Sequence, residues 1–213
     1  VFDMDGLMFD TERLALPTWQ RIAREMGYEM SAQFIMDMFG RNVAEISKDI
    51  KRVYGEAFDT DLGWKLRKQY VTEWIEEHGV PLKPGLKELL QYIRSKDLKT
   101  AIATSTDLHL VEHYLDLASL SCYFDGIVTG QMVQRGKPAP DIYQKAAQTI
   151  GIDPKDCLAL EDALAGVRSA KAAGMRVIMI PDMVAPTEEI KKVYTKECED
   201  LFGVIEYIRC QQE

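Results

Sequence analysis

Between residues 86 and 180 the chain alternates short apolar runs with amphipathic stretches, and this alternation constrains its fold more than any other feature. Four apolar runs have the composition of strands: residues 99–104, 124–129, 157–160 and 176–180. Helical periodicity covers the segments before and between them: residues 86–95, 109–117, 141–150 and 163–173. Short apolar strands alternating with helices form a parallel sheet covered on both faces. We therefore predict a doubly wound α/β fold, with Val1 and Phe2 as the end of a further buried strand.

Residues 11–81 interrupt the alternation. They read almost entirely as helix, with clear segments at 43–54 and 64–78, and contain no convincing strand. Glycine and proline at 79–85 mark the return to the α/β pattern. We predict a core domain of residues 1–10 and 82–213 with a helical domain of residues 11–81 inserted in it. The C-terminal stretch 186–212 is expected to be helix-rich and to cover the edge of the sheet.

Charge and cysteine content narrow the classes of partner. The 213 residues carry a formal net charge of −8, which repels nucleic acid and anionic membranes, so neither is expected as a partner. A small phosphorylated metabolite can still bind in a local cationic pocket. The four cysteines form no CxxC motif, and this pattern fits a protein of the reducing cytosol. No apolar run approaches the ~20 residues of a membrane span. We expect a cytoplasmic monomer.

Polar residues follow the predicted strands where each strand ends. In an open parallel sheet, ligands bind beyond these carboxyl ends. The residues found there are Asp3 and Asp5, then Thr104, Ser105 and Thr106, then Lys137 in a loop, and finally Glu161 and Asp162. Carboxylates, hydroxyls and one ammonium at a single edge suit a divalent cation beside a phosphoryl group.

The carboxylates suit Mg²⁺, which takes one or two protein carboxylates and completes its shell with water and phosphate. Asp3 and Asp162 could supply those ligands, and Glu161 could hold a coordinated water. A cation also removes the repulsion between clustered carboxylates.

The same edge can perform phosphoryl transfer. Asp3 can attack phosphorus and form an aspartyl-phosphate. The Thr104 hydroxyl and Lys137 would stabilise the phosphoryl oxygens. Asp5 is placed to give a proton to the leaving oxygen and then to take one from water.

Each motif taken alone has a simpler interpretation. Asp-x-Asp-Gly can be a turn, Thr-Ser-Thr a helix N-cap, Lys-Pro a solvated loop, and Glu-Asp the start of a helix. These interpretations do not explain why all four motifs follow successive strands. A phospho-accepting receiver domain also combines acids, Thr and Lys, but its acceptor lies on an internal strand of a smaller, uninterrupted domain. A catalytically silent binding protein would be expected to lack Asp3 or Asp5.

Four motifs together resemble the haloacid dehalogenase-like phosphohydrolase superfamily: Asp3-Met-Asp-Gly-Leu, Thr104-Ser-Thr, Lys137-Pro-Ala-Pro-Asp and Leu160-Glu-Asp-Ala-Leu-Ala-Gly. The closest likeness is to the helical-cap branch of β-phosphoglucomutase-like proteins and sugar-phosphate phosphatases. The resemblance implies a Rossmann-like core, a helical cap and Mg²⁺.

The resemblance also implies roles for particular residues. Asp3 would be the nucleophile, and Asp5 the general acid/base whose backbone carbonyl also binds metal. Thr104 and Lys137 would hold phosphate, and Glu161 and Asp162 would complete the metal site. Ser105, Thr11 and the cap residue Arg41 are further candidates for substrate contact.

Departures from the family pattern bear on the reaction. The presence of Asp5 argues against dehalogenation. Where β-phosphoglucomutase carries a histidine and an arginine in its cap, this chain has Ala15 and Val43. A Mg²⁺-dependent phosphatase of small phosphorylated metabolites, chiefly sugar phosphates, is therefore favoured over the alternative, a β-phosphoglucomutase-like mutase.

Overall fold

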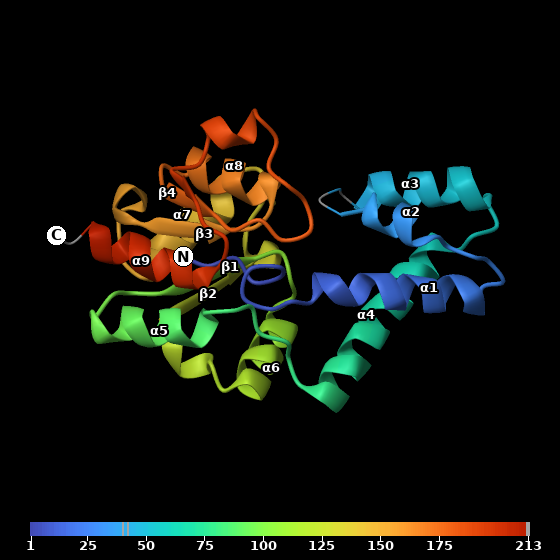
Figure 1. Cartoon of the computed structure of the whole chain (residues 1–213), viewed down its shortest axis with the longest axis horizontal. Coiled ribbons are helices and arrows are strands. Elements are labelled where there is room, and N and C mark those ends of the chain that lie inside the picture. The colour runs from blue at the N-terminus through green and yellow to red at the C-terminus, as the bar shows by residue number, and fades with distance from the viewer. Residues whose placement is uncertain (40, 42, 212–213) are drawn as a thin grey trace. The chain divides into compact units, whose positions relative to one another are not determined.

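The computed structural model describes residues 1–39, 41 and 43–211 (Figure 1). The chain divides into two compact units. Val1–Asp10 and Pro81–Glu213 form the first, here called the core unit, and Thr11–Val80 form the second, the helical unit.

The described residues of the helical unit form four α-helices and no strand. The helices are α1 (Ala15–Glu25), α2 (Ala32–Met36), α3 (Val43–Tyr54) and α4 (Thr60–His78). Side chains from all four, including Trp19, Ile35 and Ile50, form one apolar cluster. Two helices begin at polar caps, because the side chains of Ser31 and Asp59 accept hydrogen bonds from backbone N–H groups of the first turn.

The core unit alternates strands and helices. Its strands are β1 (Ala101–Thr104), β2 (Gly126–Thr129), β3 (Leu158–Glu161), β4 (Arg176–Met179) and β5 (Lys196–Glu197). Its helices are α5 (Leu86–Ser95), α6 (Leu108–Ala118), α7 (Asp141–Thr149), α8 (Leu164–Ala172) and α9 (Leu201–Cys210).

The first residues of the chain join these strands into one parallel array. β1 pairs with β2, and β3 with β4 and then β5, all in parallel. Phe2 bridges Ile102 on one side and Leu160 on the other. Its N–H donates to the carbonyl of Ala101 at 2.8 Å, and the N–H of Asp3 donates to that of Leu160 at 3.0 Å. The order across the sheet is therefore β2, β1, the N-terminal segment, β3, β4 and β5.

This order creates a switch point. From the N-terminal segment the chain proceeds to β1 and β2 on one side, and it then returns to β3 and proceeds to β4 and β5 on the other. Ligands of open α/β sheets bind where the strand order reverses, at the carboxyl ends of the strands. That place lies between Asp3 and the end of β3.

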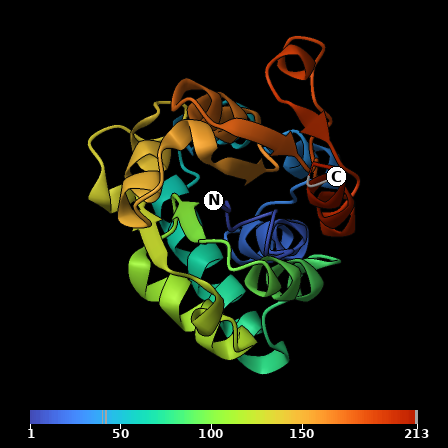
Figure 2. The ribbon, with the colours of Figure 1, turned by 90° about the vertical axis from the view of Figure 1, so that its left-hand side faces the viewer.

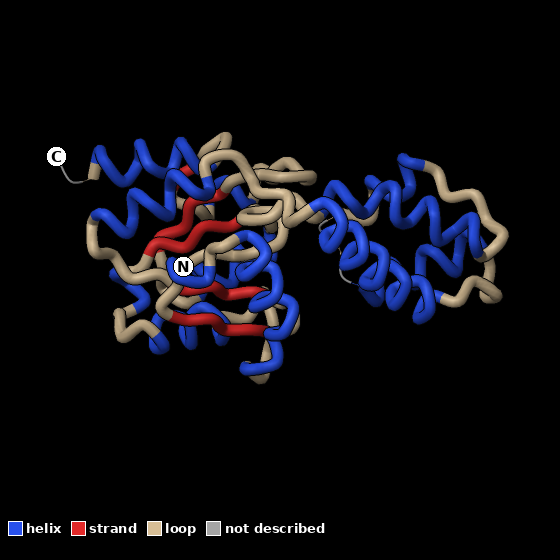
Figure 3. The backbone as a smooth tube through the Cα atoms, turned by 90° about the horizontal axis from the view of Figure 1, so that it is seen from below, coloured by secondary structure: helices blue, strands red, loops and turns tan. Residues whose placement is uncertain are grey.

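Helices cover both faces of the array (Figures 2 and 3). α7 and α8 pack on one face, where Val1, Ala101 and Ala103 join a large apolar cluster. α5 and α9 pack together on the other. Because side chains alternate along a strand, Asp3 points to the same face as Val1, towards α7.

The predicted α/β fold is confirmed. All four predicted strands are present, and α3 and α5 begin and end as predicted. The description of the C-terminal stretch was wrong in part, because β5 precedes α9 there and adds a strand to the sheet edge. Both residues of β5 are exposed and charged, so no apolar pattern marks it.

Candidate active site

Three carboxylates meet at the switch point. Asp3 ends the N-terminal segment, Glu161 is the last residue of β3, and Asp162 follows it. One oxygen from each lies within 4.8 Å of the others. Burial raises the pKa of Asp3 to about 7, with the ammonium of Lys137 opposing this rise and the carboxylate of Glu161 adding to it.

Lys137 brings a positive charge into this cluster. Its Nζ donates to Asp3 Oδ1 at 2.5 Å and to Glu161 Oε1 at 2.6 Å. Burial favours the neutral amine, but the carboxylates of Asp3 and Glu161 outweigh it and raise the pKa of Lys137. Lys137 is therefore a fixed ammonium in contact with two of the three acids.

Glu161 is fully buried and held from several sides. Oε1 also accepts from the Tyr143 hydroxyl at 2.6 Å, and Oε2 accepts from the backbone N–H of Ala163 at 3.2 Å. A Cβ on Gly166 would lie 1.7 Å from Oε1, so only glycine at this position of α8 leaves room for the carboxylate. Burial and the charge of Glu161 keep the pKa of Tyr143 well above its ordinary value, which makes it a permanent donor.

Asp162 shows that a positive charge is still missing. Its Oδ1 is buried and has no hydrogen-bond partner among the described residues. Burial and the charges of Asp3 and Glu161 raise its pKa well above the ordinary value. Three acids facing one lysine leave uncompensated negative charge, and hard oxygen donors are the ligands that Mg²⁺ prefers. The donor set therefore fits a divalent cation.

Asp5 and Thr104 lie at the same edge. The Thr106 hydroxyl donates to Asp5 Oδ2 at 2.7 Å, and the Thr106 N–H donates to Thr104 Oγ1 at 3.1 Å. Asp5 is also close enough for its charge to act on the pKa of Asp3. The loop after β1 is thus connected to the Asp3–Asp5 turn, and Ser105 lies exposed in that loop.

The other two candidates belong to the helical unit. Thr11 is buried there. Arg41 is exposed, and its guanidinium donates to Asp49 at 2.6 Å, so it already has a partner within its own unit.

Two residues of this edge were assigned no role from the sequence. Thr106 is the third residue of the Thr-Ser-Thr motif at the strand end, but nothing in the sequence links it to Asp5. Tyr143 lies in the helix predicted over residues 141–150, and its position on the buried face gives no sign that its hydroxyl contacts Glu161.

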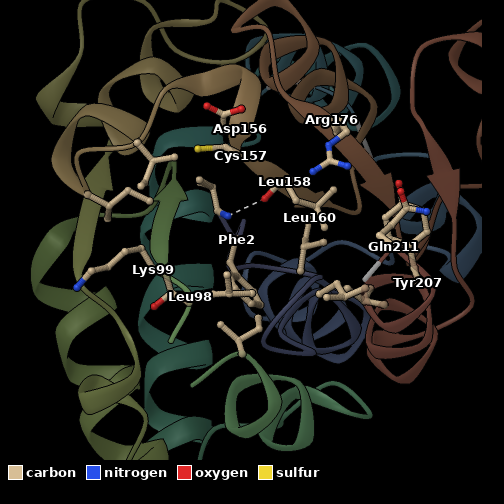
Figure 4. Close-up of a pocket in the computed structure, with 17 residues that line it drawn as sticks. Phe2, Leu98, Lys99, Asp156, Cys157, Leu158, Leu160, Arg176, Tyr207 and Gln211 are labelled. Atoms are coloured by element: carbon tan, nitrogen blue, oxygen red, sulfur yellow. Dashed lines mark hydrogen bonds between the residues drawn. The ribbon is translucent and has the colours of Figure 1, made fainter. Parts of the chain in front are cut away.

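A cavity of about 520 Å³ lies at the opposite, amino ends of the strands (Figure 4). Its lining includes Phe2, Lys99, Leu158 and Arg176. The backbone nitrogen of Val1 donates to the Leu158 carbonyl at 2.8 Å within it. None of the candidate residues lines this cavity, so the cavity is separate from the acidic cluster.

The match to a known family agrees with this geometry. The family described as haloacid dehalogenase-like hydrolase matches residues 1–180. The chain belongs to the haloacid dehalogenase-like hydrolase family. The resemblance read from the four motifs is therefore confirmed, and the enzyme is a hydrolase-family member with the family's α/β fold.

Relatives of known sequence support the assignment. The "Phosphorylated carbohydrates phosphatase" of Thermotoga maritima is 31% identical over 186 residues, covering 84% of this chain and 82% of the relative. The chloroplastic protein SUPPRESSOR OF QUENCHING 1 of Arabidopsis thaliana is 34% identical over 188 residues. That match covers 84% of this chain but 17% of the much longer relative.

Solved structures show the same architecture. CbbY from Rhodobacter sphaeroides, crystallised with phosphate, has a TM-score of 0.77 and 25% identity, covering 94% of this chain and 92% of that chain. β-Phosphoglucomutase from Clostridium difficile has a TM-score of 0.75 at 21% identity, covering 98% and 93%, which is a likeness of fold. In the described part of the chain, no helix has the length and apolar character needed to cross a membrane.

Proposed function

We propose that this enzyme is a Mg²⁺-dependent phosphatase of small phosphorylated metabolites, with sugar phosphates as the preferred class. The observation that carries the proposal is the position of Asp3, a buried carboxylate ion-paired with Lys137 and beside Glu161 and Asp162 at the switch point. The relative named for phosphorylated carbohydrates supports the choice of substrate class.

The cation would be held by the carboxylates of Asp3 and Asp162 and by the backbone carbonyl of Asp5, with Glu161 holding a coordinated water. When bound, Mg²⁺ supplies positive charge that stabilises the phosphoryl oxygens during transfer. Lys137 contributes a second positive charge from the protein itself. Its contacts with Asp3 and Glu161 support this role, because they hold the ammonium beside the carboxylate that would carry the phosphoryl group.

The reaction would proceed in two steps. In the first, an Asp3 oxygen forms a bond to phosphorus as the bond to the leaving oxygen breaks, and the Asp5 carboxyl gives its proton to that oxygen. In the second, Asp5 takes a proton from water, the water oxygen bonds to phosphorus, and the bond to Asp3 breaks. The Thr106 hydroxyl, which donates to Asp5, orients this acid/base in both steps.

Phosphate contacts would come from Thr104, Ser105 and Lys137. We propose that the helical unit is a cap that selects the leaving group and excludes water, with Arg41 and Thr11 as substrate contacts. Arg41 would then exchange its partner Asp49 for substrate. The unpaired cysteines and the net charge of −8 support a cytoplasmic enzyme acting as a monomer on small substrates.

The test is a panel of sugar phosphates, nucleotides and other phosphomonoesters with inorganic phosphate as the readout, in Mg²⁺ and in EDTA. We expect phosphate release from sugar phosphates, loss of release in EDTA and recovery with added Mg²⁺. Metal-independent turnover would contradict the proposed ligand set. An isomeric sugar phosphate formed without phosphate release would identify a β-phosphoglucomutase-like mutase, which shares the first step but returns the phosphoryl group to a sugar.

A further inference from the structure

A second buried ion pair lies at the same end of the core unit. Lys83, at the return from the helical unit, places its Nζ 2.7 Å from Asp182 Oδ1 in the loop after β4. The two side chains are 11% and 3% exposed. The backbone N–H of Lys83 donates to the carbonyl of Met8 at 2.9 Å, which fixes the lysine against the turn that follows Asp3. None of the roles proposed above involves this pair.

The second oxygen of Asp182 has no such partner. Oδ2 is buried, and among the described residues nothing forms a hydrogen bond with it. It lies 3.3 Å from the point where a Cβ on Gly6 would stand, and Asp162 Oδ2 lies 2.3 Å from the same point. Both oxygens therefore face the space over Gly6, whose positive φ of 82° and missing side chain leave that space open.

An unpaired, buried carboxylate oxygen is costly unless a donor reaches it. The described protein atoms do not provide one, so the donor has to be a water or a ligand. Mg²⁺ keeps several of its waters when it binds to proteins, and each of these waters has hydrogens to donate. Asp162, the neighbour of Asp182 over Gly6, is a carboxylate proposed above to hold that cation.

We propose that Asp182 is an outer carboxylate of the cation site. Its Oδ2 accepts a hydrogen bond from a water of the cation's shell, while Lys83 holds Oδ1 and balances the charge. Partners of this kind orient the ligands around a metal without touching it. The inference rests on the proposed cation site and adds a residue to it that none of the four motifs contains.

The experiment is a calorimetric titration of the metal-free protein with Mg²⁺ at pH 8, comparing the wild type with Asp182→Asn. Asparagine keeps an oxygen for Lys83 but presents an amide donor in place of Oδ2. Partners of this type change metal affinity by about 10–100-fold, so we expect D182N to bind Mg²⁺ at least ~10-fold more weakly. The matched control is Asp125→Asn, which also removes a carboxylate paired with a lysine, Lys99 at 2.8 Å, and should bind Mg²⁺ as the wild type does.

Thermal unfolding separates this role from a purely structural ion pair. The proposal predicts that D182N, which also weakens the ion pair with Lys83, lowers the Tm more in Mg²⁺ than in EDTA, because the cation stabilises the variant less than the wild type. A D182N protein that binds Mg²⁺ within twofold of the wild type, or that loses the same Tm with and without Mg²⁺, would overturn it. A wild type that binds no Mg²⁺ would remove the cation site of the proposed function as well. If D182N does not fold, Asp182→Ser is measured in the same way.

Discussion

Replacing Lys137 by Met tests whether the acidic cluster is held together by one buried ammonium. Methionine keeps the unbranched side chain except for its charged terminal atom, so the carboxylates of Asp3 and Glu161 lose the contacts of 2.5 and 2.6 Å. Breaking a buried ion pair costs about 3–5 kcal/mol, because the remaining charge is uncompensated. For a protein of this size, that corresponds to a fall in Tm of about 6–20 °C.

The stability that K137M loses should depend on pH and on Mg²⁺. Asp3 already has a pKa raised to about 7, and loss of the ammonium that lowers it would raise it further. Above pH 7 wild-type Asp3 is ionised beside Lys137, whereas Asp3 of folded K137M holds a proton that the unfolded chain has released, and holding this proton costs more free energy as the pH rises. The deficit of K137M should therefore be larger at pH 8 than at pH 5.5, and Mg²⁺ should reduce it.

Urea unfolding at both pH values, in EDTA and in Mg²⁺, measures these effects. The control is Lys99→Met, which breaks an exposed pair with Asp125 and should change the free energy of unfolding little at either pH. A K137M deficit below about 1 kcal/mol at pH 8 in EDTA, where about 3–5 kcal/mol is expected, would refute the reasoning. A deficit that is equal at the two pH values would refute it too.

Two further predictions concern the same cluster. Asp3→Asn should abolish phosphomonoester turnover without unfolding the protein. The folded pKa of Asp3, about 7, exceeds its ordinary value of 3.8, so this carboxyl's contribution to the stability of the metal-free protein is lost as the pH rises through 7. Urea unfolding of D3N should therefore lack that part of the pH dependence. Unchanged turnover would remove Asp3 from the nucleophile's role. Gly166→Ala should displace Glu161, lower the free energy of unfolding by about 1–3 kcal/mol and weaken Mg²⁺ binding. A variant with wild-type stability and wild-type Mg²⁺ affinity by calorimetry would contradict this, and would mean that α8 can shift to accommodate the methyl group.

The sequence predicted the sheet well wherever a strand is buried on both faces, because such strands read as continuous apolar runs. Residues 101–104 and 158–161 illustrate this. β5 lacks the signal, since Lys196 and Glu197 are exposed and charged and join the sheet edge through backbone pairing. The N–H of Cys198, for example, donates to the carbonyl of Met179 at 2.9 Å. Backbone pairing of this kind has no side-chain pattern to detect.

The start of α4 shows a second limit of prediction from the sequence. The helix expected from residue 64 begins at Thr60, because the side chain of Asp59 accepts a hydrogen bond from the Leu62 N–H at 2.9 Å. The cap was visible in the sequence as an Asp before the apolar pattern, but periodicity alone places the start one turn too late.

In the site, the residues found from the sequence are those that follow strands, because parallel strands bring their carboxyl ends together whatever the length of chain between them. Asp3 and Asp162 are 159 positions apart in number and meet for this reason. Tyr143 reaches the same cluster from the first turn of α7, where only packing of the helix on the sheet decides which atom its hydroxyl meets.

Asp182 also follows a strand, but it was not selected from the sequence. It stands three residues after β4, the strand next to β3 in the sheet, so the rule that selected Glu161 and Asp162 applies to it as well. Position alone would have given it no role, because many acids follow strands and stay solvated. What distinguishes it is that one oxygen is held by Lys83 while the other is buried over Gly6 without a donor. The end of a strand shows where a ligand can bind, and a buried carboxylate oxygen without a donor at that end indicates that a bound ligand can supply a hydrogen bond there.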